Sequence, residues 1–290
     1  MASSLSYKFK TSDTLIKLII VNVAVFFIVR LGAFFLNIPA AYFSRWFVLS
    51  DHLDTLLIRP WTLLTYGFLH FDFLHILFNM LWLYWFGRIV LNLFTGRRLL
   101  TIYFLGAIAG GALFVLSYNF FPVFESHRGF LIGASGAVTA IMIFIATYTP
   151  NTEFRIFSFN IKLWHIALVL FLLDLLRIPS SGNAGGLLAH VGGGVFGYIY
   201  ALQLSKGKDI GKWFENFLDW IVNLFERKPK TPFKKVYKTQ KTSRRESSPK
   251  VSKTEYQERI DAILDKISQS GYDSLSKEEK DFLFKAGKED

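Results

Sequence analysis

Long hydrophobic stretches, separated by short polar or glycine-rich segments, fill the first two thirds of the chain. They cover residues 15–37, 74–94, 99–122, 135–149, 160–178 and 186–205. A helix needs about 20 mostly apolar residues to cross a hydrocarbon core ~30 Å thick. The pattern predicts an all-α, polytopic membrane protein whose six transmembrane helices form a bundle.

The fourth hydrophobic stretch is shorter than a full span and begins at Ser135. A helix that starts there begins below the membrane surface. Backbone groups at that depth need protein or water as neighbours rather than lipid. We therefore expect the start of this helix to face protein or a water-filled space.

The segment between the first two predicted helices, residues 38–73, carries many large apolar side chains. Tyr42, Trp46 and Trp61 are among them. Tyrosine and tryptophan are favoured at the membrane interface. We expect this loop to lie partly in the interface rather than in water.

The pattern changes after Leu204, so residues 1–205 are predicted to be the membrane domain. In residues 206–226, apolar side chains recur at helical spacing. This pattern is typical of an amphipathic helix on the membrane surface. Residues 227–250 are basic and rich in proline and serine, which favours a disordered linker held near anionic lipid. Residues 251–290 are amphipathic again and predict a small helical hairpin.

Two local signals support the hairpin. Gly271 suits the end of its first helix. Ser276 and Glu279 have the spacing of a capping box at the start of the second. The unit is too small to bury much core alone.

The composition excludes an ordinary soluble fold, because the chain is 52% hydrophobic and 17% aromatic with a mean hydropathy of +0.33. It has no cysteine, which excludes disulfides, thiolate metal sites and cysteine nucleophiles. Nucleic-acid binding by the basic tail is the competing interpretation of its charge. We do not expect it, because no aromatic stacking platform accompanies the charges.

The placement of basic residues predicts the orientation in the membrane. One set of segments carries Lys8, Lys10, Arg97, Arg98, Arg155, Lys162 and the basic tail, whereas the opposite set carries only Arg45, Arg59 and Arg128. We therefore expect both termini in the cytoplasm, a plasma (inner) membrane location, and a Ser135 helix that opens toward the outside.

Ser135 is the first candidate for chemistry, because Gly133 and Gly136 flank it at the start of a buried helix. Glycine lets another backbone approach closely, and the first turn of a helix has unpaired N–H groups. A serine hydroxyl there can act as a nucleophile. Plain helix packing is the alternative.

His190 is the second candidate, and Gly193 and Gly197 follow it in the last hydrophobic stretch. Small residues four apart let a partner helix approach closely. A charged group within a span costs ~2.5–3.5 kcal/mol, so ionisable groups there are functional candidates. A neutral histidine bonded across helices is the alternative. If the two helices meet, Ser135 and His190 form a catalytic pair.

His75 and Asn79 lie four residues apart and so share one helix face. Near a helix start they can donate hydrogen bonds to a developing oxyanion. His70, His75 and His190 could instead bind a metal ion. No carboxylate accompanies them at ligand spacing, so we expect neither a metal nor a cofactor.

These motifs occur in a fixed order on separate hydrophobic segments: His70-x4-His75-x3-Asn79, Gly133-Ala134-Ser135-Gly136, and Ala189-His190-x2-Gly193-x3-Gly197. In this arrangement the chain resembles the rhomboid intramembrane serine proteases over about residues 15–205. The tail lies outside the resemblance.

The resemblance implies a six-helix bundle in which Ser135 attacks the scissile carbonyl and His190 acts as general base and then acid. It implies no third, acidic member. The oxyanion would be held by His75, Asn79 and the Ser135 backbone N–H. The implied substrates are transmembrane segments of other membrane proteins, cleaved near small residues where the helix unwinds easily.

Three positions depart from some family members. Thr62 follows Trp61 where an arginine is common, Leu91 stands where some members carry a glutamate, and Thr139 replaces a tyrosine that stacks on the histidine. A membrane-protein binder without catalysis is the alternative function. A solute transporter would show an internal repeat, and the two halves of the chain show none.

Overall fold

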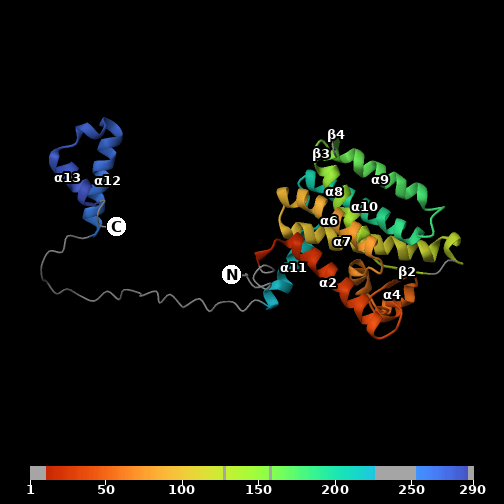
Figure 1. Cartoon of the computed structure of the whole chain (residues 1–290). Coiled ribbons are helices and arrows are strands. Elements are labelled where there is room, and N and C mark those ends of the chain that lie inside the picture. The colour runs from red at the N-terminus through yellow and green to blue at the C-terminus, as the bar shows by residue number, and fades with distance from the viewer. Residues whose placement is uncertain (1–10, 127–128, 157–158, 226–252, 287–290) are drawn as a thin grey trace. The chain divides into compact units, whose positions relative to one another are not determined.

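The computed structural model describes residues 11–126, 129–156, 159–225 and 253–286 (Figure 1). The chain divides into two compact units, Met1–Lys228 and Pro229–Asp290. The predicted linker at 227–250 and the basic residues Lys8 and Lys10 lie outside the described residues.

The first unit contains one apolar helix within or overlapping each of the six predicted hydrophobic stretches. These helices are α2 (Thr14–Phe35), α6 (Phe73–Leu93), α7 (Gly96–Phe120), α8 (Ser135–Tyr148), α9 (Leu163–Arg177) and α10 (Ala184–Ser205). Among the described residues, four helices are long and apolar enough to cross a membrane: α2, α6, α7 and α10. The shorter helices α8 and α9 have 14 and 15 residues.

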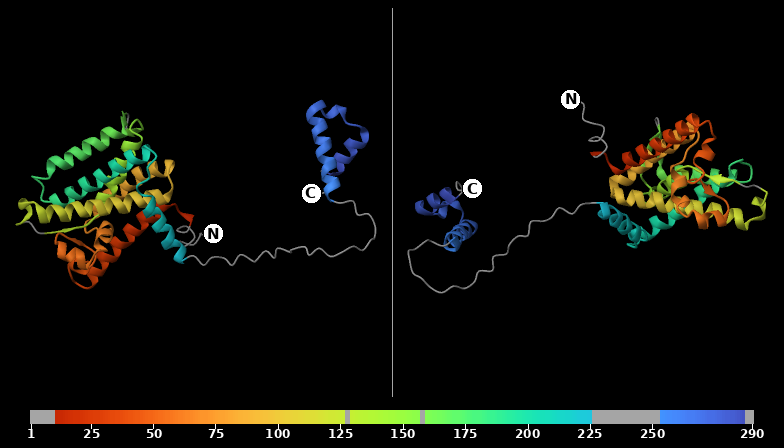
Figure 2. Two further views of the ribbon diagram at one scale, coloured as in Figure 1. Left: turned by 180° about the vertical axis from the view of Figure 1, so that it is seen from behind. Right: turned by 90° about the horizontal axis from the view of Figure 1, so that it is seen from below.

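Helix α8 lies at the centre of this unit and packs against α10, α7, α6 and α9. Its burial continues around the helix: Ala137, Ala140, Ile141 and Phe144 are all almost inaccessible to solvent. Figure 2 shows α9 at the edge of the bundle, beside α10. The core is thus organised around α8, whereas α9 buries only Leu163 and Ala167 among its apolar side chains.

Two short antiparallel strand pairs interrupt the expected all-helical architecture. Strand β1 (Leu49–Ser50) pairs with β2 (Phe130–Leu131), with Leu49 opposite Leu131. Strand β3 (Glu153–Ile156) pairs with β4 (Phe159–Lys162). The expectation that helix begins at residue 160 is therefore wrong. A hydrophobic run that short does not distinguish a strand from the start of a helix.

The aromatic loop between α2 and α6 is ordered into short elements: α3 (Ala40–Phe43), α4 (Leu53–Ile58), α5 (Thr62–Thr65) and the 3-10 helix η1 (Tyr66–Phe68). The Trp61 indole donates to the carbonyl of Trp46 at 2.8 Å. The guanidinium of Arg59 lies 3.9 Å from the centre of the Trp46 ring and donates to the Arg45 carbonyl at 3.2 Å. Arg59, two residues before Trp61, anchors this loop.

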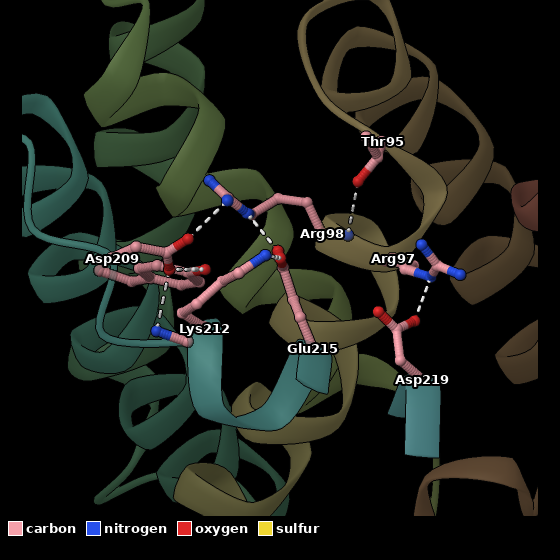
Figure 3. A network of polar contacts seen from close by, with 9 residues as sticks. Thr95, Arg97, Arg98, Asp209, Lys212, Glu215 and Asp219 are labelled. Atoms are coloured by element: carbon pink, nitrogen blue, oxygen red, sulfur yellow. Dashed lines mark hydrogen bonds and ion pairs between the residues drawn. The ribbon is translucent and has the colours of Figure 1, made fainter. Parts of the chain in front are cut away.

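A polar network attaches helix α11 (Lys212–Phe225) to the start of α7 (Figure 3). Arg98 on α7 donates to Asp209 and to Glu215, each at 2.6 Å. The Arg98 and Glu215 side chains are only 15% and 7% exposed. Arg97 pairs with Asp219 closer to the surface. The contacts fix α11 against the bundle through a largely buried cation.

The second unit contains α12 (Lys253–Ser270), the 3-10 helix η3 (Tyr272–Ser274) and α13 (Lys277–Ala286). Gly271 follows α12 with φ +77°, as a helix-terminating glycine does. The predicted capping box is confirmed: the Ser276 N–H donates to the Glu279 carboxylate, and the Glu279 N–H donates to the Ser276 hydroxyl. Lys266 bonds to Glu279 across the hairpin and lowers the pKa of that carboxyl group.

The Arg98 network predicts a large difference between two neighbouring arginines. Arg98→Ala removes the cation shared by Asp209 and Glu215 and leaves Glu215 only the exposed Lys212, so it should lower the free energy of unfolding by about 3 kcal/mol. Arg97→Ala removes a pair whose arginine is 60% exposed and should cost less than about 1 kcal/mol. Thermal unfolding in detergent measures both. Equal losses in the free energy of unfolding would show that burial does not determine how much each ion pair contributes to stability.

Candidate active site

Ser135 is the first residue of α8, and a sharp turn after strand β2 brings the chain to it. Gly133 has φ +108°, a conformation that only glycine adopts readily. A Cβ at Gly133 would lie 2.7 Å from the His75 ring. Glycine is therefore required here both by the backbone and by the packing.

Two contacts hold this turn from the preceding part of the chain. The Gly133 N–H donates to the carbonyl of Tyr66 at 3.0 Å. The Ala134 N–H donates to His70 Nε2 at 3.3 Å. Tyr66 is itself fixed, because its hydroxyl donates to the Ala107 carbonyl on α7 at 2.7 Å. The position of Ser135 is thus set by contacts to its two preceding residues.

His70 can accept this bond because it is neutral. Burial, reinforced by the neighbouring His75, lowers the pKa of His70 to about 4. With its Nδ1–H donating to the Phe68 carbonyl at 3.3 Å, Nε2 is the acceptor. We did not expect this supporting role from the sequence, where His70 entered only as a possible metal ligand.

His190 reaches the same region because α8 and α10 approach one another at glycines. A Cβ at Gly136 would lie 3.1 Å from the Ala189 carbonyl oxygen. A Cβ at Gly193 would lie 2.0 Å from the Gly136 oxygen, and one at Gly197 would lie 2.3 Å from the Ala140 oxygen. No larger residue fits at Gly193 or Gly197 unless the helices move apart.

Ser135 and His190 line one cavity of about 180 Å³. Its other walls come from α6, α8 and α9: Asn79, Trp82, Phe86, Val138, Thr139, Met142, Leu170 and Asp174. Because Ser135 is in the first turn of α8, its backbone N–H has no acceptor within the helix. A serine hydroxyl and an imidazole therefore share a mostly apolar pocket, at the start of a helix that has a free backbone donor.

Helix α6 brings the two oxyanion candidates to the site. Its start is capped by Asp72, which accepts from the His75 N–H at 3.0 Å. Asn79 is almost fully buried and lines the cavity. One of its amide hydrogens bonds to the His75 carbonyl at 2.9 Å, which leaves a second for a ligand. The His75 ring does not line the cavity but lies against Gly133, two residues before Ser135.

An acidic side chain also contacts His190. Asp174 Oδ2 lies 2.8 Å from His190 Nδ1. The resemblance implied that no acidic residue accompanies Ser135 and His190. The structure differs, because Asp174 contacts His190. The resemblance rests on motifs that do not include α9. A lone acid within a hydrophobic stretch is the signal that could have pointed to Asp174.

The three positions at which the chain departs from some rhomboid family members lie in different parts of the structure. The Thr62 hydroxyl donates to the carbonyl of Arg59 at 2.7 Å, within the anchored loop. Thr139 lies in the cavity wall beside Ser135 and His190. Leu91 is half-buried and packs against the core. None of these residues bonds to His190 in the way that Asp174 does.

Within the described ranges, no group of three or more histidine, aspartate or glutamate side chains is arranged to hold a metal ion. The rings of His70 and His75 contact each other, with their centres 5.0 Å apart. His70 supports the Ser135 turn through its hydrogen bond from the Ala134 N–H.

Comparison with known proteins connects this geometry to a family. A family model described as "Rhomboid domain" matches residues 58–207, and one described as "Family of unknown function (DUF6576)" matches residues 250–286. The chain is 30% identical to RHOMBOID-like protein 12, mitochondrial, of Arabidopsis thaliana over 213 residues, which is 68% of this chain and 60% of that protein. It is 30% identical to Rhomboid-like protein 16, chloroplastic, of the same plant over 188 residues, which is 65% of this chain and 51% of that protein. The chain thus spans between half and three fifths of these curated relatives.

The close approach of α8 and α10 predicts that Gly193→Ala damages both stability and the site. The added methyl group forces the helices apart, and overpacking of this kind costs about 1–3 kcal/mol. Thermal unfolding measures the stability, and a structure of the variant shows whether the cavity of Ser135 and His190 has widened. Gly182→Ala is the matched control, because a Cβ at Gly182 has open space around it. Unchanged unfolding of Gly193→Ala would contradict the packing described here.

Proposed function

The chain belongs to the rhomboid family, and on that basis we propose that it is an intramembrane serine endopeptidase that cleaves transmembrane segments of other membrane proteins. The observation that carries the proposal is the shared cavity of Ser135 and His190. A serine becomes a nucleophile when an adjacent base takes its proton. An imidazole is suited to this task near neutral pH.

In the proposed reaction, Ser135 Oγ attacks the carbonyl carbon of the scissile peptide while His190 takes the hydroxyl proton. The electrons of the carbonyl double bond move to its oxygen. The carbonyl double bond then re-forms, the C–N bond breaks, and His190 gives the proton to the leaving amine. A water molecule, deprotonated by His190, attacks the acyl-enzyme, and the ester bond breaks as His190 returns the proton to Ser135 Oγ.

The Ser135 backbone N–H, the second amide hydrogen of Asn79 and the His75 ring are the proposed donors to the developing oxyanion. Such donors act strongly in a water-poor site, because they are already oriented when charge develops. Asn79 and Ser135 line the cavity, and His75 lies against the turn that presents Ser135. The proposal includes no cofactor or metal ion.

The protein is a multi-pass membrane protein, and we propose six spans: α2, α6, α7, α8, α9 and α10. The 14 residues of α8 extend about 21 Å, less than a hydrocarbon core of ~30 Å. The short length supports a Ser135 that lies below the membrane surface, in a pocket that opens to the outside. We further propose cytoplasmic termini, from the distribution of basic residues, and a plasma (inner) membrane location.

We propose that α11 lies on the cytoplasmic membrane surface and that the basic tail beyond it contacts anionic lipid. One face of α11 supports this, since Trp213, Phe217, Trp220 and Leu224 are all exposed on it. Because the chain has no cysteine, an environment-sensitive dye can be attached to a single cysteine introduced by Trp220→Cys. Asn223→Cys, on the polar flank of α11, is the control. In vesicles, the dye at 220 should report a more apolar surrounding. Equal signals would contradict the proposed placement.

Ser135→Ala should lower cleavage of a transmembrane reporter in proteoliposomes by more than about a thousandfold, and His190→Ala should do the same. Ser135→Ala should not prevent folding, because it removes one atom from the border of a cavity. His190→Ala also leaves Asp174 without its partner, so thermal unfolding of this variant is measured beside its activity. Ser180→Ala and His52→Ala are matched controls at exposed positions outside it. Retained cleavage in Ser135→Ala would exclude the proposed nucleophile. A folded wild type that binds the reporter without cleaving it would favour a catalytically inactive rhomboid-like binder.

A further inference from the structure

Asp174 occupies an unusual place in helix α9. It is the one acidic residue between Leu163 and Arg177. The leucines around it, at 172, 173, 175 and 176, are exposed on the outside of the bundle. A charged group in a span costs ~2.5–3.5 kcal/mol on insertion, so such residues usually turn inward and serve a function.

The Asp174 side chain does turn inward. It is 18% exposed, lines the cavity that holds Ser135, and places Oδ2 2.8 Å from His190 Nδ1. A carboxylate at hydrogen-bond distance keeps the proton on Nδ1. The other ring nitrogen, Nε2, is then the one that can accept a proton from Ser135.

We propose that Asp174 is a positioning residue that holds His190 in the Nδ1–H tautomer and stabilises the imidazolium formed during cleavage. This inference rests on the proposed function. The proton of Ser135 passes to His190 Nε2 and later to the leaving amine, while Asp174 remains an ionised carboxylate throughout. The roles correspond to those of a Ser-His-Asp triad built from three helices.

The other charged groups around His190 do not provide this interaction. Of the elements packed against α10, α8 and β2 contain no acidic, basic or histidine residue. Helix α7 carries Arg97 and Arg98, which are engaged with the acids near α11. Besides Asp174, α9 carries His165 near its opposite end and Arg177 at its last position, and both are exposed. On α6, His75 is the other titratable group near the ring, and a second imidazole cannot stabilise an imidazolium. Among the described residues near His190, Asp174 is therefore the counter-charge.

The competing explanation is that the Asp174–His190 contact only holds α9 against α10. Helix α9 has little buried apolar surface to hold it there otherwise. The two explanations differ in what the loss of the carboxylate does to the enzyme. If the contact is only structural, its loss lowers the amount of folded protein. A positioning residue affects the turnover and the protonation of His190 in protein that is folded.

The test measures kcat, KM and the pH profile of kcat/KM for reporter cleavage in proteoliposomes. Asp174→Asn keeps the size of the side chain but lets its amide stabilise the wrong tautomer. We expect kcat to fall about 10²–10⁴-fold while KM stays nearly unchanged. Without the carboxylate the imidazolium releases its proton more readily. The acid limb of kcat/KM should therefore move to lower pH by about one unit or more.

Three further variants make the result decisive. Asp174→Glu keeps the charge and should restore part of kcat, with the acid limb near that of the wild type. If Asp174→Asn does not fold, Asp174→Ala takes its place and should show the same fall in kcat and the same shift of the acid limb. Leu173→Asn puts the same amide on the exposed side of α9 and should leave the pH profile unchanged.

The outcomes separate the two proposals. A wild-type kcat and an unshifted acid limb in Asp174→Asn, beside an inactive Ser135→Ala, would overturn the positioning role and leave the protease assignment standing. A loss that only follows the fraction of folded protein, with the limb unmoved, would overturn it as well. If the folded wild type cleaves no reporter, the proposed function fails and this inference fails with it.

Discussion

The close approach of α8 and α10 is the constraint on which the rest of the structure depends. Glycine at Gly193 and Gly197 lets two backbones come nearer than any side chain would allow. This contact puts the residue after Ser135 against the residue before His190. The helices that surround the pair, α6, α7 and α9, then add the parts that a catalytic pair needs inside a membrane: a supported turn, an amide donor and a counter-charge.

A polar site in an apolar bundle is stable only if its polar groups have partners. The Ser135 turn meets this requirement through Tyr66 and His70, whose neutrality follows from its burial. His190 meets it through Asp174. The groups proposed to interact with a ligand are those of the Ser135 residue, one amide hydrogen of Asn79, the His75 ring and Nε2 of His190. In this arrangement the chemistry of the pocket and its stability depend on the same contacts.

The sequence predicts the long helices well, because hydrophobic periodicity and length are local properties. It also predicts that Ser135 and His190 come together, as their shared cavity shows, since flanking glycines mark both places. Asp174 and His70 escape prediction for a physical reason: their roles depend on which helix face turns toward α10 or toward the Ser135 turn, and that is decided by packing between distant segments. The β3–β4 hairpin escapes for another reason, because its strands are too short to show a period. The capping box of Ser276 and Glu279 is predicted correctly because all of its bonds are local.

The central claim is that Ser135 is an activated nucleophile and that His190 activates it. Covalent labelling with a fluorophosphonate probe tests this without any assumption about the substrate. The purified, folded protein in detergent is treated with the probe, and the modified residue is located by mass spectrometry in the wild type, Ser135→Ala and His190→Ala. Our account predicts an adduct on Ser135 in the wild type and none in either variant. A folded wild type that stays unlabelled, or an adduct on another serine, would contradict it.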